Sequence, residues 1–194
     1  MQNRGRTIVY FDNSNIFQGQ IKVGWRIDAE KLMKKLSESG DVWQTFFFAA
    51  VTDPPRYSQT NFYKLLKDKL RWEVFLFPLG SKTVTCKSCK GAWRTYTEKG
   101  VDVAIATKLL THAINKAFDT AILVSGDKDY IETIRNVKNF GLRVEIVSFR
   151  HALSRELGAE SSAPVIFLDD LKSEIEMKRP DIEAEKLTNP EEAE

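Results

Sequence analysis

Residues 120–130 read TAILVSGDKDY, and this stretch decides the fold class. Residues 120–124 form an apolar run that predicts a buried strand, and residues 130–139 predict the helix after it. Asp127 and Asp129 therefore stand at the carboxyl end of a strand. Ligands bind at that end of an open α/β sheet, and carboxylate oxygens suit Mg²⁺ or Mn²⁺.

The rest of the chain repeats this alternation of strand and helix. Apolar runs predict further strands at residues 7–11, 42–51, 73–77, 142–149 and 165–168. Helical spacing and capping residues predict helices at 16–22, 28–39, 58–70, 101–118 and 151–157. Such alternation requires right-handed crossovers, so we expect an α/β fold with three layers around a central, mainly parallel sheet.

Length and charge define the expected domain organisation. A chain of 194 residues predicts one domain, residues 1–171, with a basic insertion at 80–100. Residues 172–194 carry four basic and eight acidic side chains, which leaves −4 on this tail and +6 on the rest. We expect the tail to be flexible beyond a short helix, and the basic body suits a polyanionic partner.

Neither a membrane segment nor a signal peptide is expected. No apolar run approaches the length of a membrane span, and residues 1–6 lead straight into a strand without a signal-peptide pattern. The expectation is a cytoplasmic protein without a membrane partner.

Two further acids come from distant parts of the sequence. Asp12 follows the first predicted strand, and Asp102 lies in the first turn of the long helix at 101–118. If the strand order reverses beside the first strand, the carboxyl ends of the first and fourth strands border one crevice. Carboxylates gathered there repel one another without a cation, and a bound metal could activate water against a phosphodiester. The predicted metal ligands and catalytic residues are Asp12, Asp102, Asp127 and Asp129, supported by Asn13, Asn15 and Ser125.

Each acid also has a simpler explanation. Asp12 could start a turn, Asp102 could favour the helix dipole, and Asp127 and Asp129 could cap a helix. Taken singly, those structural roles are the better interpretation. The joint occurrence of all four at converging positions favours the metal pocket.

Three blocks carry a resemblance to a known family. VYFDNSN at 9–15, KGVDV at 99–103 and VSGDKDY at 124–130 resemble the signature blocks of the NYN domain, LabA-like branch, in the PIN-like nuclease superfamily. The resemblance covers about residues 6–150. It implies a PIN-like Rossmannoid fold and a metal-dependent ribonuclease acting on structured or processed RNA, with the four aspartates above as its acidic residues and Asn15 and Ser125 as supporting polar positions.

The insertion at 80–100 contains a single CxxC pair, Cys86 and Cys89. A zinc site needs four ligands, so it would require His112, His151 or a partner chain. Two free thiols are favoured over zinc, and a redox role is favoured least because no thioredoxin-like sequence surrounds the pair.

The same insertion is rich in cations and aromatic rings. Cations that meet phosphates and rings that stack on bases are the ingredients of single-strand binding, and we weigh this equally against a solvated hairpin whose Trp93 packs on the domain. The candidate RNA-binding residues are Lys82, Lys87, Lys90, Trp93, Arg94, Tyr96 and Lys99.

The leading functional hypothesis is an endoribonuclease dependent on Mg²⁺ or Mn²⁺, with single-stranded or structured RNA as its partner. The alternative is a catalytically silent RNA-binding or protein-interaction module. An adhesion module of DxSxS type is weakened by Ile16, and a DxD phosphatase by Ser14. Homo-oligomerisation is left open.

Overall fold

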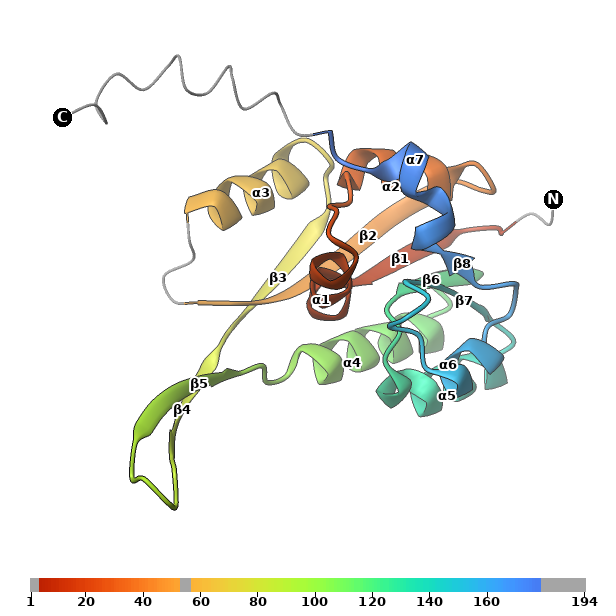
Figure 1. The fold of residues 1–194 in the computed structure, drawn as a ribbon. Coiled ribbons are helices and arrows are strands. Elements are labelled where there is room, and N and C mark those ends of the chain that lie inside the picture. The colour runs from red at the N-terminus through yellow and green to blue at the C-terminus, as the bar shows by residue number, and fades with distance from the viewer. Residues whose placement is uncertain (1–3, 53–56, 179–194) are drawn as a thin grey trace, which may run out of the picture.

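The computed structural model describes residues 4–52 and 57–178, and a six-stranded sheet forms its centre (Figure 1). Neighbouring strands in this sheet are parallel throughout. In order across the sheet, the strands are β3 (Glu73–Pro78), β2 (Val42–Val51), β1 (Thr7–Asp12), β6 (Thr120–Val124), β7 (Arg143–Ser148) and β8 (Ile166–Phe167). The first and fourth predicted strands, β1 and β6, are therefore neighbours as expected.

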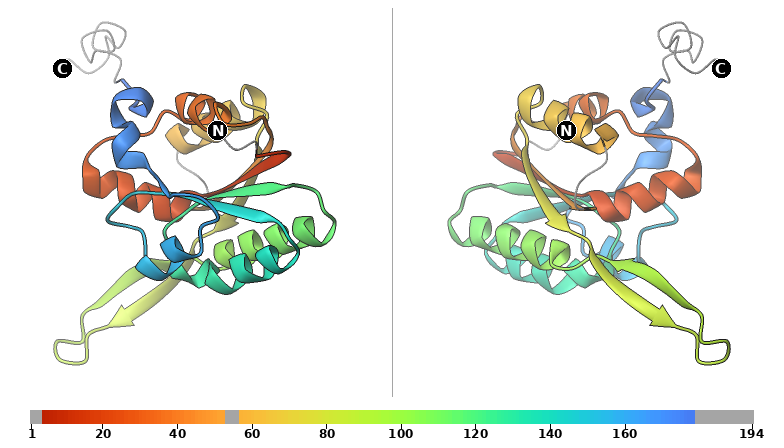
Figure 2. Two further views of the ribbon diagram at one scale, coloured as in Figure 1. Left: turned by 90° about the vertical axis from the view of Figure 1, so that its right-hand side faces the viewer. Right: turned by 90° about the vertical axis from the view of Figure 1, so that its left-hand side faces the viewer.

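Helices cover both faces of the sheet (Figures 1 and 2). One face carries α1 (Asn13–Val23), α2 (Ala29–Ser37), α3 (Tyr57–Asp68) and α7 (Lys172–Ile175), and the other carries α4 (Val101–Ile114), α5 (Ile131–Asn139) and α6 (Arg155–Ala159). Short 3₁₀ turns occupy Lys128–Tyr130 and Leu168–Leu171. The predicted three-layer α/β fold is confirmed. Within the described ranges, every helix is too short or too polar to cross a membrane.

The alternation of side chains along β1 explains why the sheet has a core on each face. All six residues of β1 are buried. Ile8 and Tyr10 pack in the core under α4 and α5, whereas Val9 and Phe11 pack in the core under α1, α2 and α3. Because successive side chains of a strand point to opposite faces, a continuous apolar run is what a strand covered on both sides needs.

Several helix boundaries differ from the prediction: α6 begins at Arg155 rather than at residue 151, and the ends of α1 and α4 differ for local reasons. α1 begins at Asn13 rather than at residue 16, because the Asp12 carboxylate accepts hydrogen bonds from the backbone of Ser14 and Asn15 and so caps the helix. α4 ends at Ile114 rather than at residue 118, and Lys116 just beyond it adopts a positive φ of 51°.

The C-terminal boundary also differs from the prediction. Ile175 of α7 is fully buried, and its carbonyl accepts a hydrogen bond from Asp28 N–H at 2.8 Å. The packed body therefore extends past the expected boundary at residue 171. Residues 179–194, where flexibility is expected, lie outside the described residues.

The insertion at 80–100 is an antiparallel hairpin of β4 (Gly80–Thr85) and β5 (Ala92–Thr97). Figures 1 and 2 show it standing away from the body. The alternative predicted a hairpin whose Trp93 packs on the domain. The Trp93 side chain is instead 51% exposed.

At Gly126, two residues after the end of β6, the backbone around Ala152 approaches closely. Its N–H donates to Asn15 Oδ1 at 3.0 Å, and its carbonyl accepts from Ser154 N–H at 2.9 Å. A Cβ at this position would collide with the carbonyl of Ala152. Only a glycine lets the segment around Ala152 lie against the end of β6.

Gly126→Ala is expected to lower the free energy of unfolding by about 1–3 kcal/mol, because backbone atoms must move to admit the methyl group. Urea unfolding followed by circular dichroism measures the change. Gly158→Ala is the matched control, since the nearest atoms to its Cβ belong to side chains, first the flexible end of Leu153 at 3.2 Å and then Val165 at 3.9 Å. Equal losses for both variants would contradict the close-approach explanation.

Candidate active site at the carboxyl edge of the sheet

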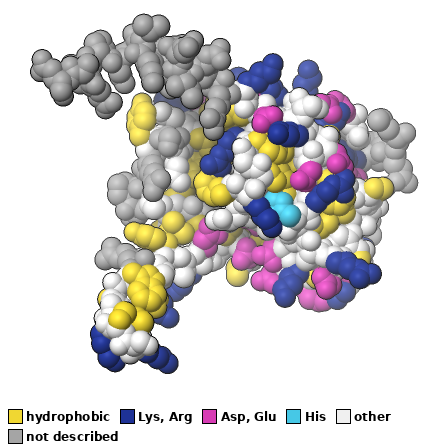
Figure 3. All heavy atoms as spheres, viewed as in Figure 1, with side chains coloured by type: hydrophobic (Ala, Val, Ile, Leu, Met, Phe, Trp, Pro, Cys, Tyr) yellow, Lys and Arg dark blue, Asp and Glu magenta, His cyan; other side chains and the backbone are white. Residues whose placement is uncertain are grey.

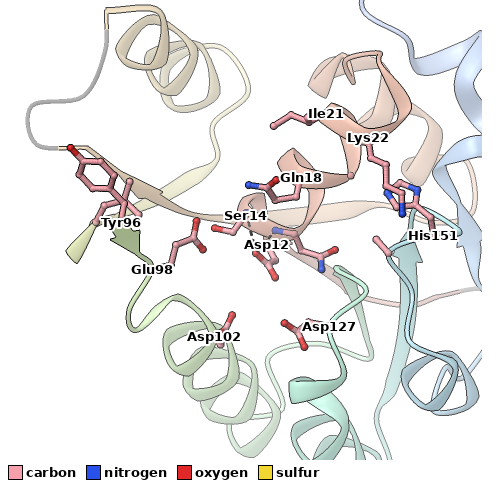
Figure 4. Close-up of a pocket in the computed structure, with 14 residues that line it drawn as sticks. Asp12, Ser14, Gln18, Ile21, Lys22, Tyr96, Glu98, Asp102, Asp127 and His151 are labelled. Atoms are coloured by element: carbon pink, nitrogen blue, oxygen red, sulfur yellow. Dashed lines mark hydrogen bonds between the residues drawn. The ribbon is translucent and has the colours of Figure 1, made fainter. Parts of the chain in front are cut away.

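The carboxyl ends of β1 and β6 border one open cavity. Phe11 pairs with Val124, so Asp12 and Ser125 follow at the same edge of the sheet. A cavity of about 820 Å³ opens beside them, lined by the carboxylates Asp12, Glu98, Asp102 and Asp127 and by the basic side chains Lys22 and His151 (Figure 4). We call it the acidic cavity.

Asp12 is only 2% exposed and is held by four hydrogen bonds. Its Oδ1 accepts from the backbone N–H of Ser14 at 3.1 Å and of Asn15 at 3.2 Å. Its Oδ2 accepts from Ser125 Oγ at 2.9 Å and from the Tyr130 hydroxyl at 3.3 Å. The carboxylate is thus fixed in position by α1 on one side and by the segment after β6 on the other.

Burial raises the pKa of Asp12 to about 6. Hydrogen bonds from the Asn15 backbone, Ser125 and Tyr130 oppose this rise, and the nearby charge of Asp102 adds to it. A carboxylate in this position is costly to ionise without a cation nearby.

Tyr130 connects the two acids that come from different elements. Its hydroxyl lies 3.0 Å from Asp102 Oδ1 and 3.3 Å from Asp12 Oδ2, and its single proton can be donated to one of them at a time. Burial, followed by the charges of Asp12 and Asp102, raises the pKa of Tyr130 far above its usual range. The hydroxyl therefore stays protonated between the two carboxylates.

The two acids after β6 have different positions. Asp127 lines the acidic cavity, and its Oδ1 accepts the backbone N–H of Asp129 at 3.0 Å. Asp129 itself is exposed and is not part of the cavity lining. The structure thus brings Asp12, Asp102 and Asp127 to one cavity and leaves the fourth predicted acid, Asp129, outside it.

The predicted supporting residues also occupy different positions relative to the acidic cavity. Asn15 lines the acidic cavity and ties α1 to Gly126, while Ser125 donates to Asp12 and accepts the N–H of Asp127 at 3.3 Å. Asn13 does not line the acidic cavity and borders a neighbouring one instead.

The donor set fits a hydrated divalent ion better than a closed cage. Across residues 4–52 and 57–178, no three His, Cys, Asp or Glu side chains are grouped closely enough to hold a metal ion. Mg²⁺ needs only one or two carboxylates and keeps several waters. Buried Asp12, with Asp102 or Asp127 beside it, supplies such ligands, and the buried Ser14 Oγ has no hydrogen-bond partner.

Sequence patterns did not single out several residues of the cavity. Tyr130 sits at a core position of its helix, where an aromatic residue signals packing and nothing in the sequence reveals its hydroxyl contacts. Glu98 lies among the basic residues of the insertion, and Lys22 and His151 reach the cavity only through tertiary packing. Of these residues, only Glu98 can be found from the sequence, because it directly precedes the KGVDV block.

Most of the predicted RNA-binding residues do not line the acidic cavity. Tyr96 does, at 59% exposure. Outside its lining lie the exposed residues Lys82, Lys87, Lys90, Trp93 and Lys99. The side chain of Arg94 is outside the described part of the structure.

An aromatic cavity of about 570 Å³ adjoins the acidic one, with which it shares Ser14, Gln18, Leu79 and Glu98. Rings supply much of its wall, from Phe11, Phe17, Phe47, Phe62, Tyr63 and Trp72. Phe17 is 41% exposed, and the Arg26 guanidinium lies 4.7 Å from its ring centre. This aromatic cavity offers flat apolar surfaces beside the carboxylates.

Comparisons with known proteins agree with this architecture. A sequence model of the NYN domain matches residues 6–169. Among solved structures, a protein of unknown function from Vibrio parahaemolyticus is similar with a TM-score of 0.68 and 19% identity, covering 91% of this chain and 100% of its own. At that identity the similarity concerns the fold alone. No curated protein matches the chain.

The raised pKa of Asp12 predicts a stability that depends on pH. The folded-state pKa of about 6 lies above the ordinary value of 3.8, so stability from this group is complete below about pH 4 and is lost as the pH rises through 6. Asp12→Asn should therefore be more stable than the parent at pH 8 by about 1–3 kcal/mol, and equally stable near pH 4.

Urea unfolding between pH 4 and pH 8 in EDTA checks this expectation. Asp68→Asn, at an exposed position at the end of α3, should leave the profile unchanged. A gain from Asp12→Asn that is the same at every pH would show that burial of the charge is not its cause.

Proposed function

The chain belongs to the NYN domain family, within the PIN-like nuclease superfamily, and we propose that it is a ribonuclease that hydrolyses RNA with Mg²⁺ or Mn²⁺ at the acidic cavity. One observation carries this proposal. Asp12 after β1, Asp102 in α4 and Asp127 after β6 come from separate parts of the chain and line the same cavity.

The residues of the cavity have distinct proposed roles. Asp12 binds the ion together with Asp102 or Asp127, and the protonated Tyr130 hydroxyl holds Asp12 and Asp102 in place. Lys22, whose side chain reaches the cavity from α1, offers a positive charge to a phosphate. A bound divalent ion supplies an activated water and stabilises charge on the phosphodiester.

The cost of burying the Asp12 carboxylate supports a bound cation at this edge. A pKa near 6 means that the ionised form destabilises the fold at neutral pH. A residue that only caps α1 could be an asparagine or serine without this cost. A cation that neutralises the charge explains the carboxylate.

We propose that RNA approaches along the hairpin and places one base in the aromatic cavity. Tyr96 lines the acidic cavity from β5, and the exposed lysines of the hairpin offer positive charges to phosphates outside its lining. Rings stack on any base, so the aromatic cavity beside the carboxylates can hold a base next to the phosphate that is cleaved. The shared lining at Ser14 and Glu98 supports this arrangement.

Asp102→Asn and Asp127→Asn are each expected to lower the rate of RNA cleavage by about a hundredfold or more, because each removes charge from the ion's surroundings. The measurement is cleavage of labelled single-stranded and structured RNA in Mg²⁺, Mn²⁺ or EDTA. EDTA should abolish the parent activity.

The controls separate this proposal from its alternatives. Asp68→Asn, far from the lining, should retain full activity. Asp129→Asn tests the fourth predicted acid: a loss as large as that of Asp102→Asn would give Asp129 a catalytic role despite its exposure. RNA binding without cleavage in any metal would instead support the silent module.

Phe17→Ala is expected to raise the KM for RNA by about tenfold with little change in kcat, since loss of a stacked base costs roughly 1–3 kcal/mol. Phe17 is partly exposed, so its removal leaves the core intact. Phe140→Ala is the matched control, because Phe140 is 51% exposed at the end of α5 and lines neither cavity. An unchanged KM for Phe17→Ala would rule out stacking at this position.

A further inference from the structure

The tip of the hairpin brings two thiols together. Cys86 N–H donates to the Gly91 carbonyl at 2.8 Å, and Lys90 N–H donates to the Cys86 carbonyl at 3.0 Å, so residues 86–91 form a closed loop. Lys90 adopts a positive φ of 57°, which turns the chain back into β5. Cys86 and Cys89 both lie in this loop, and both are free.

The two thiols stand three residues apart in this closed loop. Their CxxC spacing is the one with which a pair of cysteines binds a single zinc ion, and the closed loop fixes the backbone that carries both of them. The thiolate is the form of cysteine that binds a metal. The loop therefore offers two of the four ligands that a tetrahedral zinc site needs.

This chain does not complete the site in the part that the structure describes. Structural zinc takes four ligands, and no third His, Cys, Asp or Glu lies within metal-binding reach of the pair across residues 4–52 and 57–178. Of the two histidines, His112 Nδ1 shares a hydrogen bond of 2.7 Å with the Tyr10 hydroxyl, and His151 lines the acidic cavity. The missing two ligands are of the kind that a second copy of the same loop would provide.

We propose that the hairpin tips of two copies of this chain share one Zn²⁺, bound by Cys86 and Cys89 of each. The two loops then face each other about a twofold axis, as in most closed dimers. Four thiols lose their protons to solvent on binding, so the four thiolates and one Zn²⁺ carry a net charge of −2. Lys87 and Lys90, both exposed in the loop, bring positive charge from each copy to offset it.

The hairpin has features that fit such a contact. An isolated two-stranded hairpin is marginal in water, and β4 and β5 pair extensively only with each other. Val84 and Trp93 form the large apolar cross-strand pair that lies nearest the tip, and the Trp93 side chain is half exposed. In Figure 3 hydrophobic side chains run along the hairpin and basic ones gather at its tip. A second copy would cover this surface, and zinc would stabilise the loop.

A contact between the hairpin tips of two copies leaves the acidic cavity accessible. Tyr96 and Trp93 have opposite parity in β5, so they lie on opposite faces of the hairpin. The face with Tyr96 borders the cavity, and the face with Trp93 is available to the second copy. The proposal does not depend on ribonuclease activity.

The test uses the full chain, purified with a non-thiol reductant and loaded with Zn²⁺. Metal analysis should find about half a zinc ion per chain, and sedimentation should find a dimer that dissociates in EDTA. Co²⁺ in place of zinc should saturate at the same ratio and show the absorption of tetrahedral sulfur coordination. Cys86→Ser and Cys89→Ser should each abolish binding and give monomers, whereas Ser88→Ala in the same loop should remain a zinc-bound dimer.

Thermal unfolding of each variant tests whether the rest of the chain is still folded. If a substitution affects only the hairpin tip, the body should unfold at the same temperature as in the parent protein. One zinc per chain in a monomer would overturn the proposal, as would the absence of zinc. So would a dimer that survives both cysteine substitutions, or one that forms through a disulfide without metal.

Discussion

The structure depends on one buried carboxylate. Asp12 ends the central strand, caps α1 and accepts hydrogen bonds from Ser125 and Tyr130, so three segments meet at its two oxygens. Burial makes its ionised form unfavourable, and the surrounding hydrogen bonds compensate only in part. The same group that joins the N-terminal and C-terminal halves of the sheet therefore also places a negative charge at this edge that a cation would stabilise.

The parallel topology explains why the other groups collect around it. Each strand delivers its carboxyl end to the same edge, and β1 and β6 are neighbours only because the strand order reverses there. Asp102 reaches the edge because α4 runs back along the sheet and starts on that side (Figure 1). A single topological rule thus positions residues that are about ninety positions apart in the sequence.

Much of this arrangement could be predicted from local sequence, and the remainder depends on packing. The apolar run of β1 and the Asp28 cap of α2 are local patterns, and the structure has both. The link through Tyr130 depends on how far its ring penetrates between α4 and β1, which no periodicity encodes. For Asp129 the sequence predicts more than the packing provides. Its place after the strand predicts a second ligand beside Asp127, whereas the 3₁₀ turn leaves its side chain exposed.

The central position of β1 also affects how the chain can be assembled. β1 is paired on one side by β2, residues 42–51, and on the other by β6, residues 120–124. During translation, one edge of this buried, largely apolar strand therefore lacks its partner until β6 has been made. Unpaired edges of this kind favour mispairing and aggregation, and pairings between distant segments form slowly. The same strand order that creates the candidate active-site edge thus leaves one edge of an apolar strand open in the nascent chain until β6 has been made.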